Sequence, residues 1–131
     1  MKPGLALGQT ARVETTVTEE MFAQFEGTVV HPAYSTVSMV YHMEWAARKI
    51  ILPYLESSEE GVGGAVNVKH LNMAPLGSQV SIVATVTELR DNRVRTKIDV
   101  TNEHGLIGVG EVTQIILDKR LIEDKLTTHI F

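Results

Sequence analysis

Residues 37–55 read VSMVYHMEWAARKIILPYL and form the one long amphipathic segment of the chain. Apolar side chains recur in it at helical spacing: Val40, Met43, Ala47, Ile50, Ile51 and Tyr54. A residue suited to capping a helix precedes the segment, either Ser35 or Thr36, and Pro53 is expected to end or kink the helix. The stretch therefore predicts a long helix with one broad apolar face that a sheet must cover.

The segments around this helix alternate apolar and polar residues, which is typical of half-buried strands. One such segment precedes the helix, at residues 9–17. The segments that follow it are 62–70, a strand after Pro75-Leu76-Gly77, a strand that begins at Val94, and 106–118. Residues 18–25 are predicted as a short helical turn, 26–36 as a loop, and the tail 120–131 as a short helix. The predicted fold class is α+β: a single domain over 1–131 in which a curved antiparallel sheet wraps a central helix, the hot-dog fold.

Composition excludes several functional classes. The chain has 131 residues, a formal net charge of -4 and no cysteine. The absence of cysteine excludes disulfide frameworks, cysteine-ligated metals and a thiol nucleophile. The acidic balance argues against a nucleic-acid partner, and no apolar run is long enough for a signal peptide or a membrane span. We therefore expect a cytoplasmic protein without nucleic-acid or membrane partners.

Glu44 and His70 are the first candidates for chemistry. Glu44 lies four residues after Val40 and seven before Ile51, so we expect its carboxylate on the apolar face of the helix. His70 shares a strand face with Val66 and Val68, which should face the helix. A carboxylate and an imidazole in one layer suit acid–base catalysis. The alternatives are a carboxylate at the edge of the face that reaches solvent, and a structural histidine bonded to the backbone.

Thr36 is the third candidate. At a helix start it can cap the helix, orient a water molecule or act as a nucleophile beside free N–H groups. Other residues carry less. His42 falls off the helix face that is expected to hold Glu44. No two histidines have the spacing of metal ligands, so no metal site is expected. The glycine-rich segment Gly61-Val62-Gly63-Gly64 precedes a strand, whereas a phosphate-binding loop precedes a helix.

These residues resemble those of the fluoroacetyl-CoA thioesterase type of hot-dog protein. The resemblance runs from about Gly8 to Leu117. It rests on Thr36, the segment Met43-Glu44-Trp45-Ala46, the segment Pro53-Tyr54-Leu55-Glu56, and Val68-Lys69-His70. The spacings of eight residues from Thr36 to Glu44 and of twenty-six from Glu44 to His70 match that family.

The resemblance implies hydrolysis of a small acyl-CoA thioester, with Thr36, Glu44 and His70 as the catalytic set. It also implies that the backbone at Gly63 helps to bind the thioester oxygen. No cofactor is implied, because coenzyme A is part of the substrate. The family forms dimers with the active site at the subunit interface, so we expect a homodimer or a dimer of dimers.

Two departures limit the resemblance: the residues after Thr36, Val37-Ser38, differ from that family, and so does the segment before it. The phenylalanine-rich lid of the fluoroacetate enzyme corresponds here to residues 29–35, which contain no phenylalanine and hold Tyr34 as the one large aromatic residue. We therefore expect Tyr34 to contact the substrate and do not carry over the selectivity for fluoroacetyl groups. Two other functions remain open: a hot-dog dehydratase or hydratase acting on acyl thioesters, and a non-catalytic module that binds acyl-CoA. Covalent attack by Thr36 or Glu44 and direct attack by water also remain open.

Overall fold

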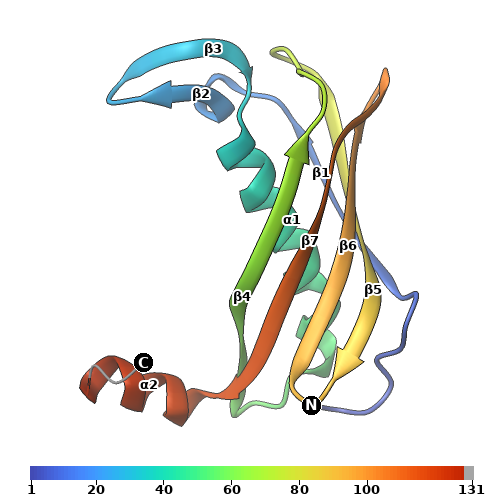
Figure 1. Cartoon of the computed structure of the whole chain (residues 1–131), viewed down its shortest axis with the longest axis vertical. Helices are drawn as coiled ribbons and strands as arrows, with labels where there is room; N and C mark the ends of the chain where they lie inside the picture. The colour runs from blue at the N-terminus through green and yellow to red at the C-terminus, as the bar shows by residue number, and fades with distance from the viewer. Residues whose placement is uncertain (129–131) are drawn as a thin grey trace.

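The computed structural model describes residues 1–128, in which a five-stranded antiparallel sheet curves around one long helix, α1 (Thr36–Ile51) (Figure 1). The strands follow one another across the sheet in the order β1 (Thr10–Thr16), β5 (Gln79–Arg90), β6 (Arg93–Asn102), β7 (Gly105–Asp118) and β4 (Glu59–His70). This arrangement confirms the predicted hot-dog fold. It also leaves β4 at one edge, with β7 as its only strand neighbour among residues 1–128.

The buried face of α1 explains how the helix is held against the sheet. Its buried residues are Met39, His42, Met43, Ala46, Ala47, Ile50 and Ile51. Inward-facing aliphatic side chains of the sheet complete this core, among them Ile82, Ala84, Ile98 and Val100. Burying such side chains contributes roughly 1.5–3 kcal/mol each to folding, so this face fixes the rotation of the helix about its axis.

The ends of α1 follow the sequence signals. Of the two predicted capping residues it is Ser35 that caps the helix, since its side chain accepts a hydrogen bond from the Ser38 N–H at 3.0 Å. Thr36 is the first helical residue. The helix ends at Ile51, and a short 3-10 turn, η2 (Leu52–Tyr54), carries Pro53. The predicted helix therefore extends four residues too far.

The rotation of α1 corrects the prediction for Glu44. Its side chain is exposed instead of lying on the buried face, and Val40 is only half-buried. Met39, His42 and Ala46 are buried in their place. Helical spacing alone allowed either choice, because Glu44 lies at the boundary between the two faces; contact with the sheet decided it.

The segment before α1 corrects a second prediction. Residues 18–25 contain only a 3-10 turn, η1 (Glu19–Met21), followed by β2 (Phe22–Phe25), and the predicted loop contains β3 (Thr28–Tyr34). These two strands form a separate hairpin that stands beyond the N-terminal end of α1 (Figure 1). Glu26 and Gly27 close it with positive φ angles of 51° and 79°, the backbone of a tight two-residue turn.

The remaining elements lie at the edge of the sheet. β4 begins three residues earlier than predicted and carries an irregularity between Gly63 and Ala65. Val66 pairs with the buried Val112 and so lies on the predicted helix-side face, but in the edge strand it is 40% exposed. The tail forms α2 (Lys119–Thr128), which projects away from the sheet (Figure 1). This confirms the predicted short helix up to residue 128, and residues 129–131 lie outside the described part.

Candidate active site

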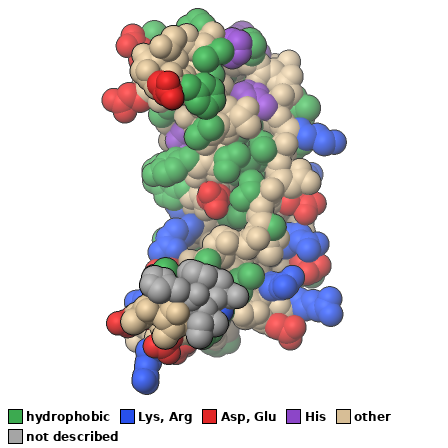
Figure 2. Space-filling model, turned by 60° about the vertical axis from the view of Figure 1, so that its left-hand side comes forward, with side chains coloured by type: hydrophobic (Ala, Val, Ile, Leu, Met, Phe, Trp, Pro, Cys, Tyr) green, Lys and Arg blue, Asp and Glu red, His purple; other side chains and the backbone are tan. Residues whose placement is uncertain are grey.

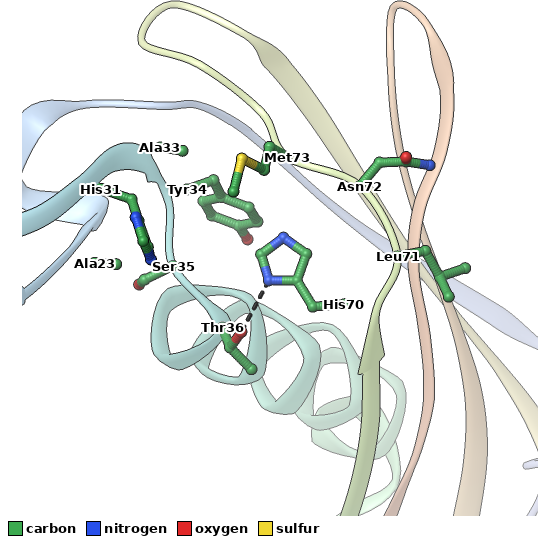
Figure 3. Close-up of a pocket in the computed structure, with 10 residues that line it drawn as sticks. All are labelled: Ala23, His31, Ala33, Tyr34, Ser35, Thr36, His70, Leu71, Asn72 and Met73. Carbon is green, nitrogen blue, oxygen red and sulfur yellow. Dashed lines mark hydrogen bonds between the residues drawn. The ribbon is translucent and has the colours of Figure 1, made fainter.

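A pocket of about 360 Å³ opens where α1 begins and β4 ends, beneath the β2–β3 hairpin (Figure 3). Its lining residues come from the hairpin, from the start of α1 with its capping residue, and from the end of β4 with the segment that follows: Ala23, His31, Ala33, Tyr34, Ser35, Thr36, His70, Leu71, Asn72 and Met73. Three residues singled out from the sequence, Tyr34, Thr36 and His70, therefore line one cavity.

Thr36 and His70 form the central contact of this pocket. The hydroxyl oxygen of Thr36 lies 2.8 Å from Nδ1 of His70, which is hydrogen-bond distance (Figure 3). Thr36 lies in the first turn of α1, and His70 is the last residue of β4. Because Ser35 already caps α1, the Thr36 hydroxyl is free to interact with the imidazole.

The surroundings of His70 keep its ring neutral. Burial lowers the pKa of His70, against a smaller opposite effect from the backbone at Asn72. Its Nε2 atom is buried and has no hydrogen-bond partner within the described chain. A neutral imidazole can accept the proton of the Thr36 hydroxyl at Nδ1, which is the geometry of a base next to a nucleophile.

Glu44 and Gly63 form a second contact, apart from the pocket. A Cβ atom added to Gly63 would lie 3.0 Å from Oε1 of Glu44, so the carboxylate rests against the glycine backbone. Eight helical residues separate Thr36 from Glu44, which amounts to about 12 Å along the axis. The structure thus brings Thr36 to His70 and Glu44 to Gly63, but the protomer shows no contact between the two pairs.

Both pairs lie along the line where α1 passes β4, which we call the α1–β4 seam. A third pair continues it: the Arg48 guanidinium donates to both carboxylate oxygens of Glu60, at 2.7 and 3.2 Å. Hydrogen bonding with Arg48 holds the pKa of Glu60 below its usual value. The seam therefore ends in an ion pair that ties the helix to the edge strand.

Exposed apolar side chains flank the seam. On α1 these are Val37, Tyr41 and Trp45, and on β4 they are Val62 and Val66. Figure 2 brings this side of the molecule forward and shows hydrophobic side chains gathered between α2 and the hairpin. Tyr41, Trp45 and Arg48 also enclose a small hollow around Glu44.

His42 is a buried polar residue of the site region that its sequence position did not single out. Its Nδ1 lies 2.6 Å from the hydroxyl oxygen of Tyr34. The available signal was helical spacing, since His42 lies three residues after Met39 and four before Ala46, both of which are buried.

Two further expectations concern metals and membranes. Residues 1–128 contain no cluster of three or more histidine, aspartate or glutamate side chains that could hold a metal ion. Within the same residues no helix has the length and apolarity that a membrane crossing requires.

Comparison with known families gives the site its context. Residues 17–120 match the model of the FlK family, described as fluoroacetyl-CoA-specific thioesterase, and this range contains all five candidate residues. The chain belongs to this family. The family's name places it among the thioesterases, which are hydrolases.

Individual relatives agree with this assignment. The chain is 31% identical over 77 residues to the fluoroacetyl-CoA thioesterase of Streptantibioticus cattleyicolor, a match that covers 59% of this chain and 55% of that protein. The alignment thus spans about half the length of this curated relative.

Solved structures extend the likeness over the whole fold. A hypothetical protein of Thermus thermophilus, described as a thioesterase superfamily member, is 45% identical, with 98% of this chain and 94% of that chain covered and a TM-score of 0.93. The fluoroacetyl-CoA thioesterase FlK is 21% identical over 98% of this chain and all of that chain, with a TM-score of 0.89. The latter likeness shows the fold.

Proposed function

We propose that this protein hydrolyses a small acyl-CoA thioester to the free acid and coenzyme A, with Thr36, His70 and Glu44 as catalytic residues. The observation that carries the proposal is the 2.8 Å contact between the Thr36 hydroxyl and the neutral His70 imidazole at the pocket. Membership of the FlK family supports thioester chemistry. Structures of FlK variants in complex with acetyl-CoA and with fluoroacetate support a small acyl group.

The start of α1 supplies electrostatic stabilisation in this proposal. The first N–H groups of a helix carry partial positive charge and stabilise a negative oxygen nearby. The thioester carbonyl would lie close to Thr36, with its oxygen facing these groups or the backbone at Gly63. Tyr34 would contact the acyl group from the pocket wall.

His70 acts as the base in the proposed reaction. It removes a proton from the Thr36 hydroxyl or from a water molecule that Thr36 orients. The resulting oxygen attacks the carbonyl carbon, the C–S bond breaks, and His70 returns the proton to the sulfur of coenzyme A. If Thr36 attacks, an acyl-Thr36 ester forms, and a water molecule activated by Glu44 hydrolyses it. If Glu44 attacks, an anhydride with the acyl group forms, and water hydrolyses it. Direct attack by water forms no acyl-enzyme.

We further propose that the functional unit is a homodimer built on the edge of β4. The support is an unpaired strand edge flanked by exposed apolar residues of α1 and β4. In antiparallel pairing about a two-fold axis near Val66, the Gly63 end of one β4 lies opposite the His70 end of the other. Each Glu44–Gly63 pair would then approach the Thr36–His70 pair of the other protomer, which would complete the catalytic set across the interface.

A screen of short, branched, aromatic and enoyl acyl-CoA thioesters tests the proposed reaction. A thiol reagent reports free coenzyme A, and enoyl absorbance reports hydration or dehydration. We expect thiol release that falls by roughly 100-fold or more in Glu44→Ala and His70→Ala. Glu123→Ala and His104→Ala are matched controls, because both residues are exposed and neither lines the pocket of Thr36 and His70.

The outcomes of this screen separate the possible functions. Thiol release with wild-type rates in the Glu44 and His70 variants would contradict the site assignment. Absorbance change without thiol release would favour a dehydratase or hydratase, and binding without turnover would favour a non-catalytic module. A cytoplasmic location remains a prediction from the sequence.

A further inference from the structure

Tyr34 and His42 form a buried polar pair directly behind the pocket. Their exposed fractions are 2% and 5%, and the hydroxyl oxygen of Tyr34 lies 2.6 Å from Nδ1 of His42. The two rings are stacked, with centroids 5.8 Å apart and planes inclined by 14°. Burial of two polar side chains is costly unless they satisfy one another, so this contact holds both rings in place.

The protonation state of the pair follows from its burial. Burial raises the pKa of the Tyr34 hydroxyl and lowers the pKa of His42. Both groups are therefore neutral near pH 7. In the simplest arrangement the Tyr34 hydroxyl donates its proton to Nδ1 of His42, which leaves the imidazole proton on Nε2. The pair adds an orientation without adding a charge beside the pocket.

The other side of Tyr34 faces the reacting groups. Its ring meets the imidazole of His70 edge to face, with centroids 6.4 Å apart and planes inclined by 71°. Figure 3 shows the Tyr34 ring beside His70, with its hydroxyl turned toward α1. The Tyr34 N–H also donates to the carbonyl of Ala74 at 2.8 Å. Tyr34 is thus held at its backbone and at its hydroxyl, and these two contacts keep its ring next to His70.

We propose that His42, acting through Tyr34, is a positioning residue that fixes the ring of His70 toward the Thr36 hydroxyl. This inference rests on the proposed thioesterase function and adds His42 to it, a residue outside the catalytic set. The His70 ring has only one hydrogen-bond partner for its side chain, at Thr36 Oγ1, while Nε2 has none within residues 1–128. A single hydrogen bond at Nδ1 constrains the ring only in part, and the T-shaped contact with the Tyr34 ring limits its rotation about the Cβ–Cγ bond.

The test uses variants that remove one partner of the Tyr34–His42 hydrogen bond at a time. Tyr34→Phe keeps the ring and removes the hydroxyl, and His42→Leu removes the acceptor. His42→Asn keeps an acceptor, because its side-chain oxygen can occupy the place of Nδ1. Tyr54→Phe is the matched control: its hydroxyl also makes a 2.6 Å hydrogen bond, which it accepts from Gln9 Nε2, but near the opposite end of α1.

We expect Tyr34→Phe and His42→Leu each to lower kcat by roughly 10- to 100-fold at a similar KM, since small displacements of a reacting group have effects of this size. His42→Asn should recover part of the loss, and Tyr54→Phe should keep wild-type kcat. Tyr34→Phe and His42→Leu each leave one buried polar atom without a partner, so each should lower the melting temperature. The double variant Tyr34→Phe/His42→Leu leaves neither, so it should recover melting temperature without recovering kcat.

A second readout separates this inference from the proposed function. Ring ¹⁵N chemical shifts of His70, measured on the resting protein, report which nitrogen carries the proton. We expect one tautomer in the wild type and an averaged signal in Tyr34→Phe. Unchanged His70 signals together with unchanged kcat would overturn the positioning role while leaving thioester hydrolysis intact. A wild-type protein that hydrolyses none of the thioesters would overturn the proposed function. The ¹⁵N signals would still decide whether Tyr34 orders the His70 ring.

Discussion

Gly63→Ala tests the role of the Glu44 carboxylate with the smallest possible change. The added Cβ would lie 3.0 Å from Glu44 Oε1, whereas ordinary contacts of this kind begin near 3.4 Å. The carboxylate must therefore retreat by about 0.4 Å. A displacement of 1 Å in a reacting group can cost 100-fold in rate, so we expect kcat to fall by roughly 10-fold.

Stability should hardly change in this variant. Gly63 has no positive φ angle, and Glu44 contacts it only with the end of a flexible side chain. Alanine in a strand is also no less favourable than glycine. We expect a change in melting temperature of no more than about 2 °C, which corresponds to a few tenths of a kcal/mol.

The neighbouring glycine provides the matched control. A Cβ at Gly64 would also meet an atom at 3.0 Å, but that atom belongs to Ile115 and not to a proposed catalytic residue. The assay is the initial rate of coenzyme A release, with light scattering to check the oligomeric state. Wild-type kcat in Gly63→Ala, or an equal fall in Gly64→Ala, would refute the reasoning. Gly63→Ala should cause no additional loss in a Glu44→Ala background.

Three other predictions concern the residues of the site and its buried histidines. Thr36→Ala should lower kcat at least 100-fold with little change in melting temperature, because Ser35 caps α1; Thr36→Ser should retain part of the activity, and an intact rate in the alanine variant would exclude the hydroxyl. Burial lowers the pKa of His42 and of His70, so the unfolded chain binds more protons than the folded one below the ordinary histidine pKa. Thermal melts should therefore show full stability above about pH 6.5 and falling stability as the pH drops below it; a flat profile between pH 7 and pH 5 would contradict the burial of these rings. Mixed Glu44→Ala and His70→Ala protomers, inactive alone, should regain about a quarter of wild-type activity after co-refolding, because half the dimers are mixed and each has one complete site; no recovery would place the catalytic set within one protomer.

The layers of this fold could be predicted from the sequence, because burial of one face gives the apolar residues of each strand and helix a regular spacing. The alternation in the strands and the spacing of Met43, Ala47 and Ile50 each have one physical explanation, contact between α1 and the sheet. The β2–β3 hairpin has no such pattern. It lies off the main sheet, most of its residues are exposed, and Glu26 adopts a positive φ that is unusual for its residue type.

The candidate site was predictable only in part for a related reason. Thr36 and His70 are adjacent in space because α1 runs antiparallel to β4, and the resemblance named both residues. The exposure of Glu44 and the burial of His42 depend on a rotation of the helix by a fraction of a turn. A single sequence determines that rotation poorly, since an apolar face turned toward Val40 and Glu44 also includes Ile51, although Val40 is only half-buried in the structure.

The rate of coenzyme A release from small acyl-CoA thioesters, compared between the wild type and His70→Ala, tests the central claim most directly. We predict steady release by the wild type and a loss of roughly 100-fold or more in kcat for His70→Ala, while the melting temperature and the oligomeric state stay close to those of the wild type. Equal rates in the two proteins would contradict the proposal that the Thr36–His70 pair performs the reaction.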